Sequence, residues 1–573
     1  MNSKVKLPVG RSGFAGIRNN GYYYADKSGL IEELLKTDGT QVTLITRPRR
    51  FGKTLGMSML SEFFDIRKDS GALFNGLYIA KNEQLCRGWM NQYPVVFLSF
   101  KSVDGLNFEG AAQQLKIAVS DLCVEHYELQ FSPKVNEIHK ERFQRLAKKS
   151  ASLDEVKNGL LLLTKMLMAH YDRPVILLLD EYDVPLSKAS EKGYYEEMLD
   201  VVKGMMQAVK DNDALKFAVL TGCLRISKES IFTGLNNLKV CSVTDIRFAR
   251  YFGFTDTEVQ ALLTYYGYPE RYDTAKKWYD GYCFGGTEVY CPWDVLNYCD
   301  SLLDDREAQP QNYWINTSSN DAVKRFIQES KNRMTKREIE QLVAGGVITK
   351  EIRQELTYPE IYQTTDNIFS LLFMTGYLTQ RGKAEGRQMK LAIPNLEVRD
   401  IFVTQIMEFF RENVQADGDT LNRFCDALQN KDAENAEKIF TQYLRKTISI
   451  RDTAIHKEMK ENFYHGVLIG ILGVKDRWGV SSNKEMGEGY ADILVEPDTG
   501  DTGIATGIII EVKYAHDGNL DGACKEALKQ IEHTRYEDDL EDDGVENILK
   551  YGIACYKKRC RVMLAENRQQ YSK

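Results

Sequence analysis

The chain has 573 residues, of which 43% are hydrophobic and 27% are charged, and its formal net charge is −7. This length exceeds what one hydrophobic core can organise, so we expect about three or four compact units. The negative charge argues against a uniformly basic nucleic-acid-binding protein, although local basic strips remain compatible with phosphate contacts.

The sequence favours a cytoplasmic protein without a membrane partner. It contains no run of about 18 apolar residues that could span a bilayer. The first residues, "MNSKVKLPVGRSGF", lack the apolar stretch of a secretory signal. The eleven cysteines form no C-x-x-C pair, which is typical of reduced thiols and not of a zinc site.

The first 250 residues predict a doubly wound α/β domain. Short, wholly apolar runs alternate with helical patterns, and such runs indicate parallel strands that helices cover on both faces. The predicted strands are 41–46, 93–100, 174–180 and 215–221, and the longest helical stretches are 108–128 and 153–171.

Two further regions follow. Residues 251–400 hold short, aromatic-rich helices and a helix that leads into a short strand, which together predict a helical, winged-helix-like lid. Residues 401–573 begin with helices and return to strands in "YADILVEP", "GIIIEVKYA" and "YGIACYKKRCRVML". We therefore expect a third, α/β domain with a helical lead-in at the end of the chain.

The segment "RPRRFGKT", residues 47–54, differs at one position from the phosphate-loop pattern G-x-x-x-x-G-K-[ST], because Arg47 occupies the place of the first glycine. A predicted strand precedes it and a helix follows, so backbone N–H groups and the helix dipole favour phosphate there. We expect Lys53 to contact the β- and γ-phosphates of ATP and the Thr54 hydroxyl to ligate Mg²⁺. An arginine-rich surface turn is the alternative. The predicted nucleotide contacts of this loop are Arg49, Arg50, Phe51, Gly52, Lys53 and Thr54.

The run "PVILLLDEYD" places Asp180 and Glu181 at the carboxyl end of a predicted strand, where open α/β sheets bind ligands. We expect Asp180 to hold Mg²⁺ through water and Glu181 to act as the general base that orients the attacking water. Capping of the next helix is the alternative. Thr221, at the end of the following strand, and Arg225 are weaker candidates for contact with the γ-phosphate or with a neighbouring subunit.

A third constellation lies near the end of the chain. Asp492 belongs to one predicted strand, and Glu511 and Lys513 lie two residues apart on one face of the next. Two carboxylates and a lysine on one face favour Mg²⁺, with Mn²⁺ as an alternative, and phosphodiester chemistry with Lys513 stabilising charge. A surface salt bridge between strands is the other interpretation. Glu461, which shares a helix face with His465, is a further metal-ligand candidate. Gln530 and Tyr536, on the next helical stretch, are candidate substrate contacts.

These segments together resemble a bacterial family that joins an AAA-ATPase-like domain to a PD-(D/E)xK nuclease-superfamily domain. The resemblance extends over nearly the whole chain and includes "LPVGRSGFAGIRNNGYYYADKSGLIEELL", "RPRRFGKT", "LLLDEYD", "TGCLRISKESIFTGLNNL", "GYADILVE", "IIIEVKY" and "YGIACYKKR". The arginine-rich loop without its first glycine is similar to that family's own version. The resemblance implies a P-loop NTPase that binds ATP and Mg²⁺, nuclease chemistry, and a role in defence or mobile-element biology.

We therefore expect an ATPase whose nucleotide state controls a metal-dependent nuclease domain acting on nucleic acid, with DNA favoured over RNA. The main alternative is a nucleotide-dependent switch or scaffold whose nuclease-like domain binds without cutting. A third interpretation is a nucleic-acid-remodelling motor, which would form a homo-oligomeric ring with an arginine supplied by the neighbouring subunit.

Overall fold

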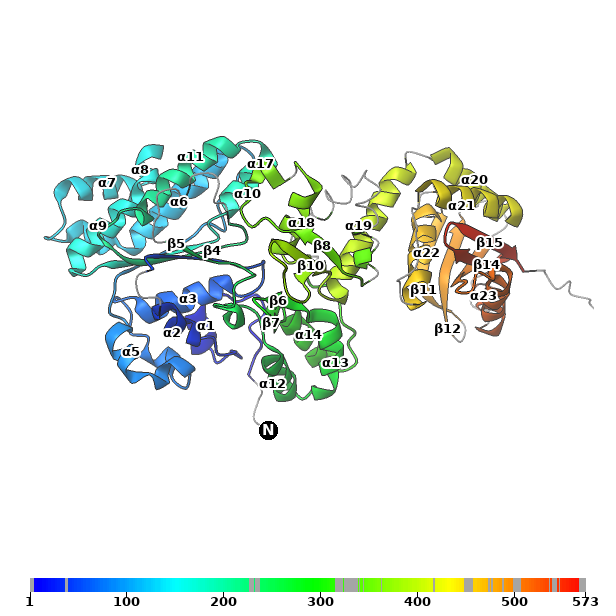
Figure 1. Ribbon diagram of the computed structural model, residues 1–573, viewed down its shortest axis with the longest axis horizontal. Helices are drawn as coiled ribbons and strands as arrows, with labels where there is room; N and C mark the ends of the chain where they lie inside the picture. The colour runs from blue at the N-terminus through cyan, green and yellow to red at the C-terminus, as the bar shows by residue number, and fades with distance from the viewer. Residues whose placement is uncertain are drawn as a thin grey trace, which may run out of the picture. The chain divides into compact units, whose positions relative to one another are not determined.

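The computed structural model of the chain (Figure 1) divides into two compact units. The first contains Met1–Ser319 and Thr349–Val398, and the second contains Asn320–Ile348 and Arg399–Lys573. The residues that the structure describes are 5–36, 40–225, 231, 238–314, 323, 338–339, 341–343, 345–361, 363–415, 418–447, 457–472, 475, 478–486, 489–497, 506–534, 536–537, 540, 544–545 and 547–565. Among them, no helix has the length and apolar character needed to cross a membrane.

Five parallel strands form the central sheet of the first unit, in the order β2-β3-β4-β1-β5. Every residue of β1 and β3 is buried, as predicted for strands covered on both faces. β4 lies between β1 and β3 in the sheet. The end of β4 therefore separates the loop that follows β1 from the acidic residues that follow β3. The strand bounds are β1 Val42–Thr46, β2 Val95–Ser99, β3 Val175–Asp180, β4 Leu215–Gly222 and β5 Leu238–Cys241.

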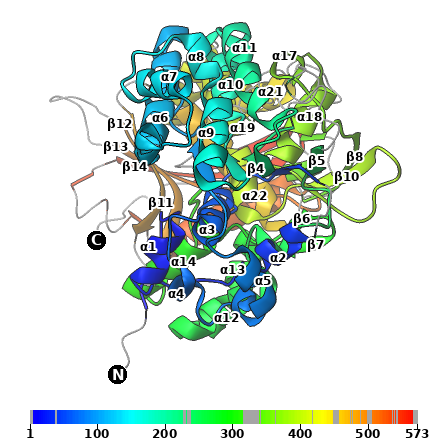
Figure 2. The ribbon, with the colours of Figure 1, turned by 90° about the vertical axis from the view of Figure 1, so that its left-hand side faces the viewer.

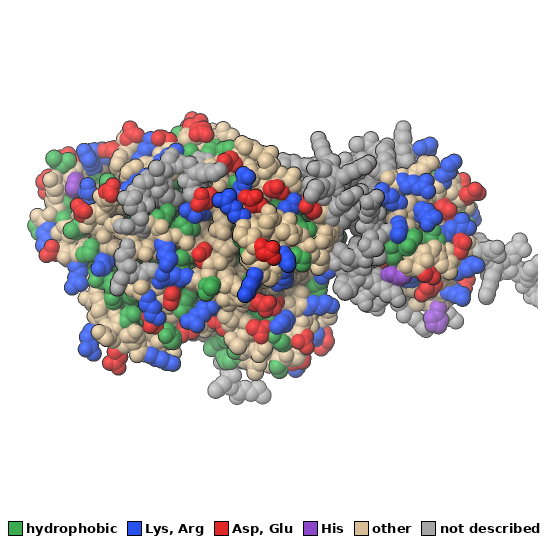
Figure 3. All heavy atoms as spheres, in the orientation of Figure 1, with side chains coloured by type: hydrophobic (Ala, Val, Ile, Leu, Met, Phe, Trp, Pro, Cys, Tyr) green, Lys and Arg blue, Asp and Glu red, His purple; other side chains and the backbone are tan. Residues whose placement is uncertain are grey.

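Helices cover both faces of this sheet, and Figures 1 and 2 show α1–α5 on one side and α6–α11 on the other. The first set comprises α1 Phe14–Asn19, α2 Gly29–Leu35, α3 Lys53–Phe64, α4 Gly71–Phe74 and α5 Glu83–Trp89. The second set comprises α6 Phe108–Glu125, α7 Glu137–Ala147, α8 Leu153–Lys157, α9 Gly159–Tyr171, α10 Val184–Lys192 and α11 Tyr195–Met205. Figure 3 shows acidic and basic side chains interspersed over the visible face of the first unit.

The predicted helical stretch 153–171 is two helices, α8 and α9, and not one. The break falls at Asn158, whose side-chain amide donates a hydrogen bond to the carbonyl oxygen of Asp154 (2.8 Å). Asparagine competes in this way for backbone groups, and the glycine that follows it weakens the helix further.

The middle region combines short helices with a small antiparallel sheet, and through Val398 it belongs to the first unit except for Asn320–Ile348, which is assigned to the second. The predicted helix that leads into a strand is α18, followed by β9. An aromatic-rich core unites α12, α13 and α14. The element bounds are α12 Asp256–Tyr266, α13 Tyr272–Tyr279, β6 Tyr282–Phe284, β7 Thr287–Val289, α14 Pro292–Asp304, β8 Ile348–Glu351, α17 Tyr358–Ile361, α18 Thr365–Met374, β9 Thr379–Gln380 and β10 Gln388–Ala392.

The second unit contains a mixed sheet in the order β11-β12-β13-β14-β15, in which only the β13–β14 pair is parallel. Alternate residues of β13 enter two cores, because Ile508 and Ile510 pack with α20–α22 while Ile509 packs with α23. The bounds are α19 Leu396–Gln415, which crosses the division between the units, α20 Gly418–Gln429, α21 Ala433–Thr447, α22 Lys457–Leu472, β11 Trp478–Met486, β12 Gly489–Pro497, β13 Thr506–Tyr514, α23 Leu520–Thr534, β14 Asn547–Tyr556 and β15 Arg559–Leu564.

Candidate functional site

The arginine-rich loop joins β1 to α3, and α3 begins at Lys53. Two loop residues adopt left-handed backbone conformations, Arg50 with φ of 72° and Gly52 with φ of 84°. Gly52 is the N-cap of α3, where the absence of a Cβ makes this conformation accessible. The strand, tight loop and helix start therefore follow one another as a phosphate loop requires, with the free N–H groups of α3 at the loop.

Arg47, in the place of the first glycine, is a fully buried structural residue. Its guanidinium donates hydrogen bonds to the carbonyl oxygens of Thr46 (2.7 Å), Cys241 (3.1 Å) and Arg247 (3.3 Å). It also lies over the ring of Phe284, 5.2 Å from the centroid. Burial lowers the pKa of this guanidinium to about 10, so it remains charged at neutral pH. Arg47 thus ties the loop to the end of β5 from inside the protein.

Lys53 points into the loop and is only 3% exposed. Its amine donates to the carbonyl oxygens of Arg47 (3.0 Å) and Pro48 (3.1 Å) and lies 3.3 Å from Glu181 Oε1. Burial alone would lower the pKa of this amine, but Cys223 and the carboxylates around it, Glu181 first among them, raise it above its ordinary value. A full positive charge is therefore held at the inner side of the loop.

The Asp180 carboxylate accepts hydrogen bonds from hydroxyl groups on three neighbouring elements. Its Oδ2 accepts hydrogen bonds from Thr54 (2.8 Å) and Ser99 (3.1 Å), and its Oδ1 accepts one from Thr221 (2.6 Å). The ends of β2, β3 and β4 and the start of α3 therefore converge on one buried carboxylate. The structure brings together the predicted pair Thr54 and Asp180, while it places Thr221 as a buried partner of Asp180.

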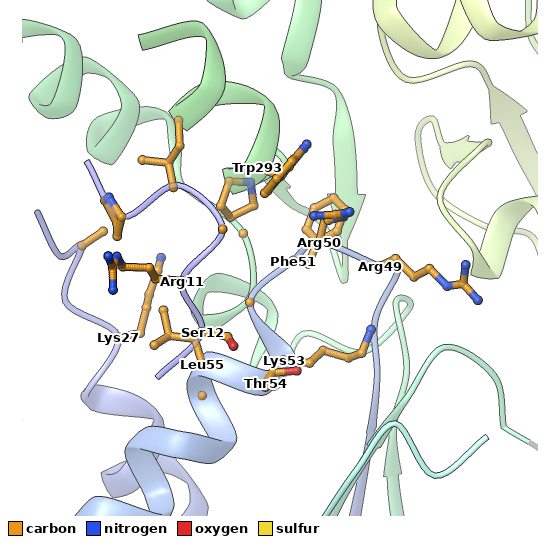
Figure 4. A pocket seen from close by; sticks show the side chains of 18 of the residues that line it. Arg11, Ser12, Lys27, Arg49, Arg50, Phe51, Lys53, Thr54, Leu55 and Trp293 are labelled. Atoms are coloured by element: carbon orange, nitrogen blue, oxygen red, sulfur yellow. The ribbon is translucent and has the colours of Figure 1, made fainter. Parts of the chain in front are cut away.

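A cavity of about 450 Å³ opens beside the loop (Figure 4). Its walls include the six predicted loop residues, Arg49 to Thr54, and Glu181. In Figure 4, Arg50 lies next to Trp293, and the guanidinium is 4.0 Å from the ring centroid. Arg225 is not part of these walls; it forms an ion pair with Glu355 at 2.8 Å.

In the second unit, the predicted acidic residues meet at the edge between β12, β13 and α22. Asp492 Oδ2 accepts the backbone N–H of Val512 (2.9 Å). The amine of Lys513 lies 3.2 Å from Glu511 Oε1 and 3.2 Å from Glu461 Oε1. One lysine is thus held between two carboxylates that come from different elements, and Asp492 is fixed on the neighbouring strand.

Comparisons with known proteins identify a family match for each of the two domains. Residues 8–232 match the family model described as predicted AAA-ATPase, and residues 459–564 match the PD-(D/E)XK nuclease superfamily. An uncharacterized protein in the vnfD 5′ region of Azotobacter chroococcum mcd 1 is 31% identical over 408 residues, which are 69% of either chain. The chain belongs to this bacterial family, which joins an AAA-ATPase-like domain to a PD-(D/E)XK nuclease-superfamily domain.

A solved structure gives a much weaker likeness. The Aeropyrum pernix ORC2 protein, solved as ADPNP-ADP complexes, matches over 66% of this chain and 92% of its own at 11% identity. Its TM-score of 0.24 is too low to carry an argument. The assignment of the ATPase-like domain therefore depends on the sequence families and on the strand, loop and carboxylate geometry described above.

Each domain holds a buried carboxylate oxygen that has no hydrogen-bond partner among the described residues, Glu181 Oε2 and Glu511 Oε2. In the nuclease-superfamily domain, burial and then the charge of Asp492 raise the pKa of Glu511 to about 7. A divalent cation would relieve both effects, since it supplies a partner for the oxygen and offsets the repulsion. The residues present therefore fit a metal ion.

The fit is to a cation that takes few protein ligands. Within the described part of the chain, no three side chains of His, Cys, Asp or Glu lie close enough together to form a metal site. Mg²⁺ commonly binds through one or two carboxylates and completes its shell with water and substrate phosphates. Asp492 and Glu511 in one domain, and Thr54 and Asp180 in the other, match that pattern.

Three features of these sites were missed at the sequence level. Asp183 is 2% exposed, and its Oδ2 accepts the N–H groups of Cys223 and Leu224 (both 2.9 Å), which joins the acidic turn after β3 to the end of β4. Its position as the third acid of "DEYD" was the available signal. The cavity-wall residues that no spacing pattern indicated include Pro8, Gly10, Arg11, Ser12, Tyr23, Tyr24, Lys27, Lys101, Lys188 and Trp293.

The third missed feature is a buried acid pair behind the cavity wall. Asp294 follows Trp293 at the start of α14, and its buried carboxyl interacts with the carboxyl of Glu397. Glu397 Oε1 also accepts the backbone N–H of Trp314 (2.9 Å). Burial, followed by the charge of Asp294, raises the pKa of Glu397 to about 10, so this carboxyl keeps its proton at neutral pH.

One prediction is corrected. Tyr536, expected to contact substrate, is 1% exposed and packs in the core with Leu494 and Ile509. The aromatic ring packs on the face of the sheet that α23 covers. The sequence pattern does not distinguish a buried tyrosine from an exposed one, because tyrosine is found in both environments.

Proposed function

We propose that the chain binds and hydrolyses ATP in the cavity beside Lys53, and that its nucleotide state controls cleavage of nucleic acid by the C-terminal domain. The supporting observation is that each domain places next to a lysine a carboxylate with one buried, unpartnered oxygen. Buried carboxylate oxygens without partners are destabilising, and ion-dependent phosphoryl chemistry would account for those of Glu181 and Glu511.

In the ATPase-like domain, the loop would bind the phosphates, and residues at the strand ends would hold Mg²⁺ and orient water. The Lys53 amine would replace its hydrogen bonds to the carbonyl oxygens of Arg47 and Pro48 with contacts to phosphate oxygens. The N–H groups at the start of α3 would bind the same phosphates. Thr54 and Asp180 would hold Mg²⁺. Glu181 lines the cavity and would orient the attacking water and accept its proton.

In the nuclease-superfamily domain, Asp492 and Glu511 would hold Mg²⁺ or Mn²⁺. The bound ion would polarise the phosphodiester and favour formation of hydroxide. Lys513 would stabilise the negative charge that develops on the phosphate, and Glu461 fixes the amine in place through the 3.2 Å contact. DNA is the proposed substrate, with RNA as the comparison in the assay.

The test is a cleavage assay on DNA and RNA, with and without ATP and with Mg²⁺ or Mn²⁺. Lys513→Ala should lower cleavage at least ~100-fold because the phosphate loses its charged donor. Lys53→Ala should remove the response to ATP while the metal site stays intact. Lys525→Ala removes an exposed lysine of α23 and is the matched control. Undiminished cleavage by Lys513→Ala would reject the nuclease assignment.

The second candidate is a nucleotide-dependent switch whose nuclease-like domain binds nucleic acid or protein without cutting. The observation that favours it is the lack of a third acidic or thiol/imidazole ligand near Asp492 and Glu511 in the described residues. Calorimetric titration with Mg²⁺ and Mn²⁺ separates the two functions. Metal uptake that Glu511→Gln abolishes supports the nuclease, and absence of uptake by the unaltered chain supports the switch.

A further inference from the structure

Lys101 lies at the acidic edge of the central sheet. It follows β2 by two residues, and the backbone N–H of Phe100 donates to the carbonyl oxygen of Asp180 (2.9 Å). The hydroxyl of Ser99, at the end of β2, donates to the Asp180 carboxylate that also accepts Thr54. Lys101 therefore leaves the sheet beside the carboxylate that would hold the metal, and it lines the same cavity as Lys53 and Glu181.

The side chain of Lys101 is exposed and forms no ion pair or hydrogen bond with any residue that the structure describes. Several other cations of the cavity wall are engaged. Lys27 lies 2.6 Å from Glu258, and Lys188 lies 2.8 Å from Glu191. Arg50 stacks on Trp293, and Lys53 faces Glu181.

The position along the cavity indicates which part of a nucleotide Lys101 would meet. The phosphate loop fixes where the phosphates lie, and Thr54 with Asp180 marks the end that holds the metal and the γ-phosphate. The N-terminal segment with Pro8 and Tyr24, and Trp293 of α14, form other parts of the wall. From the Asp180 edge, a flexible lysine stem would be nearer to the terminal phosphate than to the base.

We propose that Lys101 is a catalytic residue that contacts the γ-phosphate of ATP bound to its own chain. It would supply within one chain the positive charge that a ring-forming ATPase takes from a neighbour's arginine. This role suits the structure because Arg225, the residue first considered for that contact, is paired with Glu355. The inference rests on the proposed ATP hydrolysis.

In the proposed hydrolysis of ATP, Lys101 is neither covalently modified nor a proton donor. The oxygen of the attacking water forms a bond to the γ-phosphorus, and the bond from that phosphorus to the β,γ-bridging oxygen breaks. The electron pair of the broken bond leaves on ADP, and the proton of the water passes to the Glu181 carboxylate and then to solvent. Lys101 keeps its three protons and stabilises the charge on the equatorial oxygens of the transferring group.

The first experiment compares Lys101→Ala, Lys101→Arg and Lys134→Ala in the full chain. Lys134 is exposed and lies outside the cavity, so it controls for loss of a surface charge. We expect Lys101→Ala to lower kcat for ATP about 100-fold while the Kd for ADP, which has no γ-phosphate, stays within about twofold. Lys101→Arg should recover most of the rate because it restores the charge.

The second experiment mixes Lys101→Ala with Lys53→Ala, two variants expected to be inactive for different reasons. Lys53→Ala offers an intact Lys101 to a neighbour, so recovery of ATP hydrolysis on mixing would show that Lys101 acts between chains and overturn the inference. No recovery, together with a rate per chain that is independent of protein concentration, supports it.

The failure of the inference is distinguishable from the failure of the proposed function. Lys101→Ala that hydrolyses ATP like the unaltered chain overturns the inference and leaves the proposed function standing. An unaltered chain that neither binds nor hydrolyses ATP overturns both. A parallel loss of kcat and of ADP affinity in Lys101→Ala would assign the lysine to general folding of the site and also overturn the inference.

Discussion

Lys53 Nζ lies 3.3 Å from Glu181 Oε1, and both side chains line the same cavity. The lysine expected to bind phosphate and the acid expected to orient water are thus each other's ionic partners in this structure. Under the proposed function, nucleotide binding would replace this contact with contacts to phosphate and water. That exchange would free the carboxylate when ATP binds.

Glu181→Gln tests the role of that carboxylate. The amide keeps the size of the side chain but cannot accept the proton of water, so we expect kcat for ATP to fall by ~10²–10³-fold. ATP should still bind, and its Kd should change little or decrease because Lys53 loses its competing partner. Phosphate release and equilibrium nucleotide binding measure the two effects. Glu197→Gln, an exposed acid of α11, is the control.

Arg47→Gly, which restores the common phosphate-loop pattern, should destabilise the ATPase-like domain by about 2–4 kcal/mol. The substitution removes the donor of two buried backbone carbonyls and of the partly buried carbonyl of Arg247, and it leaves space beside Phe284. Urea unfolding followed by circular dichroism measures the change, and Arg142→Ala on exposed α7 should alter it by less than about 0.5 kcal/mol. Equal stability of Arg47→Gly would contradict the structural role given to Arg47.

The pair Asp294 and Glu397 predicts a pH dependence of stability. The folded pKa of Glu397 is raised from its ordinary value of 4.5 to about 10. The folded state therefore binds this proton more tightly than the unfolded chain does. The resulting stabilisation is fully present below about pH 4.5 and is lost as pH rises toward 10, with a slope of at most about 1.4 kcal/mol per pH unit.

Glu397→Gln should flatten this slope, because glutamine keeps a donor for Asp294 and does not titrate. We expect the gap in urea midpoint between pH 6 and pH 8.5 to shrink in the variant. An unchanged gap would show that Glu397 is already ionised in the folded protein. Glu360→Gln, on α17, leaves the buried pair intact and serves as the comparison.

Trp293→Ala should weaken nucleotide binding without a matching loss of kcat at saturating ATP. The indole is part of the cavity wall and supports Arg50, whose backbone is left-handed. Loss of this contact should raise the Kd for ATP about tenfold, which corresponds to about 1.4 kcal/mol. Trp293→Phe retains a ring under Arg50 and should recover much of the affinity. A titration with a fluorescent ATP analogue measures the Kd of both variants.

The local sequence pattern was sufficient to predict the candidate site residues that lie next to each other in the chain. The run 174–180 is continuously apolar and ends in Asp180 and Glu181, so both the buried strand and the acids at its carboxyl end follow from local pattern. The same holds for Glu511 and Lys513, since a period of two places them on one face of β13.

Packing between distant segments decided the rest. Whether Arg47 faces phosphate or the interior depends on the carbonyl groups of Cys241 and Arg247, about 200 positions away in the sequence. The local sequence pattern around Arg47 contains no information about these partners. Lys101 and Trp293 line the cavity beside the loop for the same reason, because adjacent strands and the helices that cover them bring separate segments to one edge of the sheet. Short-range pattern sets which element forms, whereas the direction and protonation of a buried charged side chain depend on its whole three-dimensional surroundings.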